Sequence, residues 1–334
     1  MPTPSIRIGH FFPHLIEWKH AAMAEKEFLL DFKEHIERPL RKNILLSNYS
    51  SFRIGGKADY CFEAASVSEL KTAILLARQH SIPYYVIGGG YNLLFADDGF
   101  RGLIIRNRAH GIRLRGGSEV EVLSGTPLSE FIHFLEEKGL SGLEFSAGIP
   151  GTVGGAIFGN AGAFNHSLGE FLKEAVLLDE RGEERTVQRS YFKFQYRQSS
   201  LREKHHTLLQ AIFTCRSGER EEIRRVVEQN LKARERRHPP ENTACAGSYF
   251  KNPVLPDGRK VAAGELLEEV GAKGFRVGGA AVYPGHANFI LNCERAKASD
   301  VLSLARVLKE RVREKFGVEL EEEVIFLPAT SSMP

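Results

Sequence analysis

The sequence has few cysteines, a single tryptophan and no long apolar run. Its four cysteines, Cys61, Cys215, Cys245 and Cys293, are widely scattered and form no CxxC or Cys/His spacing typical of zinc. No apolar stretch approaches the roughly 20 residues that a membrane helix needs. The N-terminal Met-Pro-Thr-Pro-Ser lacks the charged and apolar regions of a signal peptide. We therefore expect a cytoplasmic protein with free thiols, no metal and no membrane contact.

An excess of charge of either sign is also missing. The chain of 334 residues has 45 Lys and Arg against 42 Asp and Glu, which gives a net charge of +3. The basic residues are interleaved with acidic ones rather than clustered with aromatics, which argues against nucleic-acid binding. A small anionic substrate is compatible with this balance. The length suits two or three domains of about 150 residues each.

Glycine, in contrast, is concentrated in the stretch from Glu144 to Gly162. Glycines allow positive φ and close approach of a ligand, and successive N–H groups can converge on an anion. A flexible linker would be polar and rich in serine, whereas Ile149, Val153 and Phe158 interrupt this stretch. The composition favours a ligand-binding loop over a linker.

A second glycine-rich turn follows a short apolar segment. Tyr84 to Ile87 is typical of a strand and leads directly into Gly88-Gly-Gly-Tyr-Asn-Leu-Leu94. This turn lacks the Lys-Ser/Thr ending of a P-loop and the GxGxxG of a Rossmann turn. It is a candidate phosphate-binding loop, although a glycine triplet alone can also form a simple tight turn.

Local patterns predict further elements. An amphipathic helix is expected over Leu15 to Glu37 and contains Trp18, with packing or partner binding as its expected role. Other expected helices begin at the cap residues Ser66, Thr126 and Ser299, and Gly139, Gly271 and Gly317 are placed to end helices. A charged helix over 218–237 should have Ile223, Val226, Val227 and Leu231 on its core edge. Strands are expected at 84–87, 103–105, 120–123, 175–178, 186–188 and 208–214.

Several motifs occur in one order along the chain. They are Ser51-Phe-Arg-Ile-Gly-Gly56, Gly88 to Leu94, Ala147 to Ala156, Asn160-Ala-Gly162, Tyr196-Arg197, Gly247-Ser-Tyr-Phe-Lys-Asn-Pro253, His286-Ala-Asn288 and Leu320-Glu-Glu-Glu-Val324. Each is weak alone, but the ordered set closely resembles the UDP-N-acetylenolpyruvoylglucosamine reductase (MurB) family. The resemblance covers roughly residues 41 to 328.

The resemblance implies an α+β fold of three domains. The first two would bind FAD in the manner of the vanillyl-alcohol-oxidase-like (PCMH-type) flavoproteins, and the third would cover the substrate. The boundaries implied are an N-terminal extension at 1–40, FAD-binding subdomains at 41–107 and 108–216, a substrate-binding domain at 217–318, and a C-terminal segment at 319–334 that returns to the active site.

The resemblance also assigns residues to non-covalent FAD. Both glycine-rich loops would hold the cofactor, because a diphosphate is well served by backbone donors and an isoalloxazine ring needs close backbone. The implied cofactor-binding residues are Gly88, Gly89, Gly90, Tyr91, Asn92, Leu93, Gly148, Ile149, Pro150, Gly151, Thr152, Gly154, Gly155, Asn160 and Gly162.

The implied reaction has two halves. NADPH reduces FAD, and the reduced flavin then passes hydride to UDP-N-acetylglucosamine enolpyruvate, which becomes UDP-N-acetylmuramate. Arg197 and Glu323 match the family residues that stabilise charge developing on the substrate carboxylate, and Ser248 matches the proton donor. The implied substrate-binding residues are Tyr196, Arg237, Lys251 and Asn252. Small molecules are the only expected partners, and a monomer is expected.

Taken singly, these residues have ordinary explanations. An arginine after Tyr196 is usually a surface residue, Ser248 could belong to a turn, and Glu323 lies in an acidic run typical of a solvated face. Only their joint placement in the family pattern favours the functional interpretation. His286 is expected to be structural.

Two alternatives and one departure remain. A related flavin oxidase would often carry His or Cys near the first loop, where this chain has Tyr91-Asn92. A non-catalytic FAD-binding module would be expected to lack some of Arg197, Ser248 and Glu323. We expect the interval from Arg197 to Ser248 to be too short for the tyrosine loop that closes over substrate in one branch of the family, so Tyr196 or Arg237 is expected to compensate.

Overall fold

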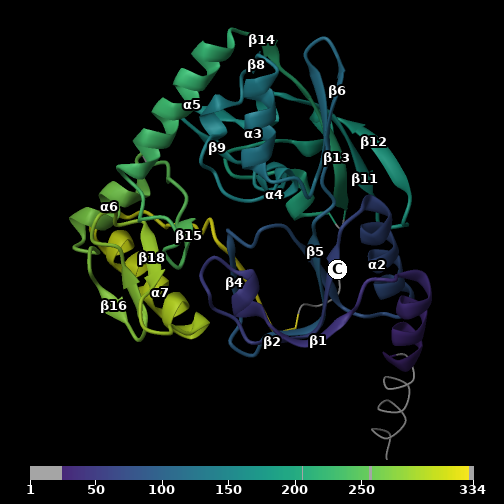
Figure 1. Cartoon of the computed structure of the whole chain (residues 1–334). Helices are drawn as coiled ribbons and strands as arrows, with labels where there is room; N and C mark the ends of the chain where they lie inside the picture. Colours follow the sequence, from purple (N-terminus) through teal and green to yellow (C-terminus); the bar gives the residue numbers. More distant parts are fainter. Residues whose placement is uncertain (1–24, 205, 256–257, 331–334) are drawn as a thin grey trace, which may run out of the picture.

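The computed structural model describes residues 25–204, 206–255 and 258–330. Three main sheets, each accompanied by helices, form three lobes around a common centre (Figure 1). Mixed parallel and antiparallel pairing with separate helices confirms the expected α+β class. No helix in the described part of the chain is long and apolar enough to cross a bilayer.

The first lobe is a four-stranded sheet in the order β1-β2-β5-β3. The strands are β1 (Arg41–Leu45), β2 (Lys57–Ala64), β3 (Tyr84–Ile87) and β5 (Phe100–Asn107). Helix α2 (Val67–Gln79) connects β2 to β3, and Ser66 caps it as predicted by accepting a hydrogen bond from the Glu69 N–H. Strand β3 ends at the residue before the first glycine loop, so the sheet fixes where that loop starts.

A helix over residues 25–35 packs on this lobe. Phe28, Phe32 and the following Ile36 are buried in one cluster with residues of α2 and β2. The predicted packing role therefore holds for the part that is described. The rest of the predicted helix, including Trp18, lies outside the described residues.

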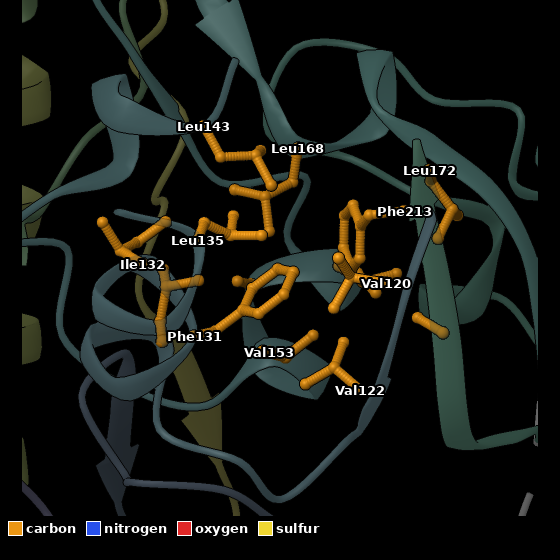
Figure 2. Close-up of a cluster of buried hydrophobic side chains, with 14 of the residues drawn as sticks. Val120, Val122, Phe131, Ile132, Leu135, Leu143, Val153, Leu168, Leu172 and Phe213 are labelled. Atoms are coloured by element: carbon orange, nitrogen blue, oxygen red, sulfur yellow. The ribbon is translucent and has the colours of Figure 1, made fainter. Parts of the chain in front are cut away.

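The second lobe is an antiparallel sheet in the order β12-β11-β13-β7-β6. Its strands are β6 (Ile112–Gly116), β7 (Glu119–Leu123), β11 (Leu172–Leu178), β12 (Glu184–Gln188) and β13 (Thr207–Thr214). Helices α3 (Leu128–Glu137) and α4 (Val153–Phe158) cover one face. Figure 2 shows Phe131 and Leu135 of α3 converging with Val122 and Phe213 of the sheet and Val153 of α4. This core anchors α4 and, with it, the second glycine loop.

The third lobe has a sheet in the order β15-β18-β17-β16. Its elements are β15 (Cys245–Ser248), α6 (Ala263–Glu269), β16 (Arg276–Val277), β17 (Ala280–Val282), β18 (Phe289–Asn292) and α7 (Ala298–Phe316). The long helix α5 (Arg220–Glu235) leads to it from the second lobe (Figure 1).

Short elements complete the chain and connect the lobes. Strand β19 (Ile325–Leu327) leaves the third lobe and pairs in parallel with β4 (Leu93–Phe95), immediately after the first glycine loop. The other short elements are β8 (Leu140–Ser141) with β14 (Arg216–Ser217), β9 (Gly162–Ala163) with β10 (His166–Ser167), and the 3₁₀ turns η1 (Leu46–Tyr49), η2 (Glu144–Ser146), η3 (Leu168–Glu170), η4 (Arg189–Phe192) and η5 (Ser200–Arg202).

Two predicted helix caps are wrong, and one predicted core residue is exposed. Thr126 hydrogen-bonds Gly111, and Pro127 occupies the cap position of α3 instead. Lys297, not Ser299, precedes α7. Leu231 on α5 is 44% exposed because it faces the glycine loop rather than the core. In each case a contact distant in sequence overrides a local pattern.

A distant carboxylate caps α7. The two oxygens of Asp97, which follows β4, accept the N–H groups of Ala298 at 2.7 Å and Ser299 at 3.1 Å. A carboxylate at a helix N-terminus satisfies free donors and complements the helix dipole. The contact also joins the first and third lobes.

We expect Asp97→Ala to lower the free energy of unfolding by about 1–2 kcal/mol, the usual cost of losing a helix cap. Ser299→Ala is the matched control and should change stability little, because the Ser299 side chain is not the cap. Chemical denaturation of both variants measures the difference. Equal destabilisation by the two substitutions would contradict the assignment of Asp97 as the cap.

Candidate active site

The two glycine-rich loops touch. A Cβ atom built on Gly88 would lie 2.4 Å from Oγ1 of Thr152, and one on Gly89 would lie 3.3 Å from the Cα of Gly151. The first of these contacts is shorter than real Cβ atoms allow, so a side chain at Gly88 would push the loops apart. The Tyr91 ring lies against Gly89 on the exposed side of this junction and is itself 45% exposed.

Free backbone donors gather at the junction. Within the described residues, no acceptor is hydrogen-bonded by the N–H groups of Gly89, Gly90, Tyr91, Gly151 and Thr152. The N–H of Gly154 is instead used by the Ser124 carbonyl, and that of Gly155 by the Thr152 side chain. Unpaired donors on two glycine loops in contact fit the diphosphate of the FAD that the resemblance implies. In the second loop, the donors at this junction are those of Gly151 and Thr152, directly before α4.

Other predicted cofactor residues have side chains engaged by the protein. The Asn92 amide donates to the Glu323 carbonyl at 3.0 Å. The Asn160 amide donates to the Gln195 carbonyl and accepts the Gly169 N–H. Leu93 is buried in β4. Gly90, at φ +73, is required by packing, because a Cβ there would lie 1.9 Å from the Tyr49 carbonyl oxygen.

The remaining predicted loop residues are positioned by the framework. The Ile149 N–H donates to the Ser146 carbonyl, and Pro150 follows it without a donor of its own. Gly148 lies against Arg234 of α5. The Gly162 carbonyl accepts a hydrogen bond from Arg197 at 2.7 Å. These contacts shape the second loop around the start of α4.

Arg197 and Glu323, 126 residues apart, form an ion pair. Nε of Arg197 lies 2.8 Å from Oε1 of Glu323, and the side chains are only 23% and 21% exposed. Arg197 has φ +54, a strained conformation for a residue with a side chain. Its Nη1 group makes no hydrogen bond within the described residues, so one donor edge remains for a ligand.

Burial dominates the electrostatics of Glu323. Loss of solvent raises the pKa of its carboxyl, although the nearby positive charges of Arg197, Arg202 and Lys251 each act to lower it. The backbone of Glu323 is fixed on both sides, by the Tyr249 carbonyl at 2.7 Å and the Asn92 amide. The carboxyl is therefore held in one place in a partly desolvated environment.

Ser248 ends β15 at an irregularity in its pairing with β18. Its hydroxyl makes no hydrogen bond to any described residue. The following residue, Tyr249, is the one whose carbonyl holds the Glu323 N–H, and Lys251 N–H donates to Glu321. The segment that begins at Ser248 thus runs beside the segment that carries Glu323.

The predicted substrate residues Tyr196, Lys251 and Asn252 lie in this region. The Tyr196 hydroxyl accepts the Asn252 N–H at 3.3 Å, and its ring lies 5.1 Å below the Arg197 guanidinium. Lys251 pairs with the exposed Glu321 at 3.0 Å. Lys260, which the sequence analysis missed, places Nζ 3.3 Å from the centroid of the Tyr196 ring.

Within the described residues, Arg237 makes no hydrogen bond or ion pair with Tyr196, Lys251 or Asn252. It is exposed, and its charge acts on His238 and His286. Arg234, one turn earlier on α5, contacts Gly148 instead, and burial together with the Arg197 charge lowers its pKa. Neither Arg234 nor Lys260 could be distinguished in the sequence from the many solvated charges around it.

A separate groove of about 900 Å³ lies between the first and third lobes. Arg53, Arg295 and Lys297 line it together with Asp97. None of the predicted site residues lines this groove, so its size does not identify the active site.

The FAD-binding domain family profile matches residues 58–188. This match confirms the predicted FAD-binding fold and cofactor. The profile of the UDP-N-acetylenolpyruvoylglucosamine reductase C-terminal domain matches residues 238–327.

Curated relatives extend over most of the chain. The UDP-N-acetylenolpyruvoylglucosamine reductase of Prochlorococcus marinus is 38% identical over 85% of this chain and 97% of its own length. Reductase 1 of Bacillus cereus is 39% identical over 84% of this chain and 91% of its own. The crystal structure of the Thermus caldophilus reductase matches with a TM-score of 0.72 at 33% identity, covering 87% of this chain and 100% of that one. The chain belongs to the UDP-N-acetylenolpyruvoylglucosamine reductase (MurB) family of FAD-dependent oxidoreductases.

Proposed function

We propose that this chain uses NADPH to reduce UDP-N-acetylglucosamine enolpyruvate to UDP-N-acetylmuramate, with Arg197, Glu323 and Ser248 as its catalytic residues. When bound, FAD supplies the hydride acceptor for NADPH and the hydride donor for the enolpyruvyl group. The observation that carries the proposal is the half-buried Arg197–Glu323 pair, 2.8 Å apart. Family membership supports the reductase activity, and the pair supports the assignment of its residues.

Arg197 is suited to hold the substrate carboxylate. As hydride reaches the enolpyruvyl carbon, negative charge develops towards that carboxylate, and a fixed cation beside it lowers the barrier. The free Nη1 edge of Arg197 can donate to a carboxylate oxygen while Nη2 stays bound to the Gly162 carbonyl. The ring of Tyr196 supports the other side of the guanidinium.

Glu323 and Ser248 are suited to donate protons or hydrogen bonds. A carboxyl with a raised pKa can stay neutral and act as a hydrogen-bond donor to a developing anion. The Ser248 hydroxyl makes no hydrogen bond within the described residues, so it is free to protonate the carbon next to the site of hydride addition.

Lys251, Asn252, Lys260 and Tyr196 are proposed to bind the UDP-sugar. The positive charges of Lys251 and Lys260 would favour binding of the diphosphate of the UDP-sugar. Tyr196 is 39% exposed and is proposed to close over the substrate in place of the tyrosine loop, which we expect the interval from Arg197 to Ser248 to lack. Arg237 is a lower-ranked candidate, because its side chain is exposed and makes no hydrogen bond or ion pair within the described residues.

The proposed setting is the cytoplasm, and the domain boundaries at 40, 107, 216 and 318 stay part of the proposal. All four cysteines are free thiols, as in a reducing compartment. The ligands proposed are small molecules only, and the protein is proposed to act as a monomer.

An absorbance spectrum is the first test. The purified protein, loaded with FAD, should be yellow, should bleach with anaerobic NADPH and should recover its colour when UDP-N-acetylglucosamine enolpyruvate is added. Bleaching without recovery would contradict the proposed substrate. Bleaching that is faster with NADH than with NADPH would contradict the proposed electron donor.

Ser248→Ala should separate the two half-reactions. We expect bleaching by NADPH to proceed at the wild-type rate, whereas recovery with the enolpyruvyl substrate should slow by about 100- to 10,000-fold, the usual effect of removing a general acid. Stopped-flow absorbance measures both steps. The control is Ser217→Ala, an exposed serine on β14, which should affect neither. Equal slowing of both steps would argue against a proton-transfer role.

Glu323 should set the alkaline limit of the second half-reaction. Because its pKa is raised, the donor form persists to higher pH than for a free glutamate, and the rate should fall as pH rises through that pKa. Glu323→Gln keeps a neutral donor at every pH, so its rate should be lower but independent of pH in that range. Glu319→Gln, 62% exposed beside Lys309, is the control. An unchanged alkaline limit in Glu323→Gln would overturn the assignment.

A further inference from the structure

Arg202 has a buried donor without an acceptor. Its Nε is the one buried side-chain nitrogen or oxygen in the described part of the chain that has no hydrogen-bond partner. No ion pair involves its guanidinium within the described residues either. A buried polar group without a partner is costly and rare in native proteins, so it calls for an explanation such as a ligand.

The surroundings of Arg202 hold it in place. Its guanidinium lies 5.6 Å from the centroid of the Phe158 ring at the end of α4, and a Cβ on Gly159 would lie 4.0 Å from Nη2. The hydroxyl of Ser199, three residues earlier, donates to the Phe158 carbonyl at 2.7 Å. The turn η5 is thereby fixed to the end of the helix that follows the second glycine loop.

Two titratable groups face this guanidinium. Glu323 acts on it from the C-terminal segment, and Tyr85 acts on it from β3, which leads into the first glycine loop. Oε1 of Glu323 is already paired with Arg197. Burial still lowers the pKa of Arg202 in spite of both groups, so the protein itself does not fully compensate the charge.

We propose that Arg202 binds FAD. Its guanidinium contacts the electron-rich edge of the isoalloxazine ring and favours the reduced cofactor over the oxidised one. The inference rests on the proposed function. Of the groups around Arg202, Phe158, Gly159 and Tyr85 belong to elements that border the two glycine loops, and Glu323 belongs to the C-terminal segment beside the candidate substrate residues Lys251 and Asn252. The cofactor is therefore the ligand that this cation fits best.

The charge balance of flavin reduction supports this role. NADPH transfers two electrons and one proton as hydride, NADP⁺ leaves, and the ring becomes an anion unless a second proton is added. A fixed cation in a partly desolvated site interacts more strongly with that anion than with the neutral oxidised ring. Arg202 would thus raise the reduction potential and ease the NADPH half-reaction.

The test compares three variants of the FAD-loaded enzyme. Arg202→Met removes the charge at similar length, Arg202→Lys keeps a cation, and Lys204→Met removes an exposed cation that stacks on Tyr191. The measurements are the two-electron midpoint potential of bound FAD and the dissociation constant of oxidised FAD. We expect Arg202→Met to lose about tenfold in preference for reduced over oxidised FAD, equivalent to a potential lower by about 30 mV.

Arg202→Lys should keep most of the wild-type preference for reduced FAD, and Lys204→Met should have the wild-type midpoint potential. An unchanged potential in Arg202→Met would overturn the proposal. If the potential of Arg202→Met is unchanged and its KM for the enolpyruvyl substrate rises, Arg202 belongs to the substrate site. If only thermal stability falls, its role is structural. Failure of the wild-type protein to bind FAD would instead contradict the proposed function as a whole.

Discussion

The site depends on the return of the C-terminal segment between the lobes. Strand β19 pairs with β4 directly after the first glycine loop, and the Tyr249 carbonyl and Asn92 amide hold the Glu323 backbone from two different lobes. Glu323 can therefore meet Arg197 only when all three lobes are assembled. This arrangement couples the integrity of the fold to the geometry of the ion pair, so that a loosened interface between lobes would separate the two charges before it unfolded any lobe.

Local structure could be predicted from local sequence patterns, whereas tertiary contacts could not. The strand at Tyr84–Ile87, the Ser66 cap and the helix end at Gly317 were predictable because each signal acts within a few residues. The cap of α7 was not, because Asp97 is about two hundred residues away from the donors that it accepts. Within the site, Arg197, Ser248 and Glu323 were found only through the family resemblance. Arg202, Arg234 and Lys260 were missed because charged residues in the sequence look alike whether they are solvated or buried.

The glycine loops illustrate two separate requirements. Gly90 is needed for packing against the Tyr49 carbonyl, and Gly154 for packing against Ser124, so neither needs a ligand to explain it. Gly89 and Gly151 differ, because a Cβ on either would meet no backbone atom closer than 3.3 Å and their N–H groups have no acceptor among the described residues. Composition alone cannot separate these cases, since both demand the absence of a side chain. The atoms packed around each glycine separate these cases, and the free N–H groups of Gly89 and Gly151 at the junction of the loops are among the proposed diphosphate-binding donors.

The direction of the pKa shifts around the site indicates which charge a ligand there would carry. Burial lowers the pKa of Arg202, Arg234 and Lys260 and raises that of Glu323, so cations and carboxylate alike are pushed towards their neutral forms. Desolvation thus outweighs pairing for both signs of charge. Cations outnumber this single carboxyl, so its charge cannot neutralise them. A ligand with several negative charges would restore the balance, and the proposed cofactor and substrate both carry such charges.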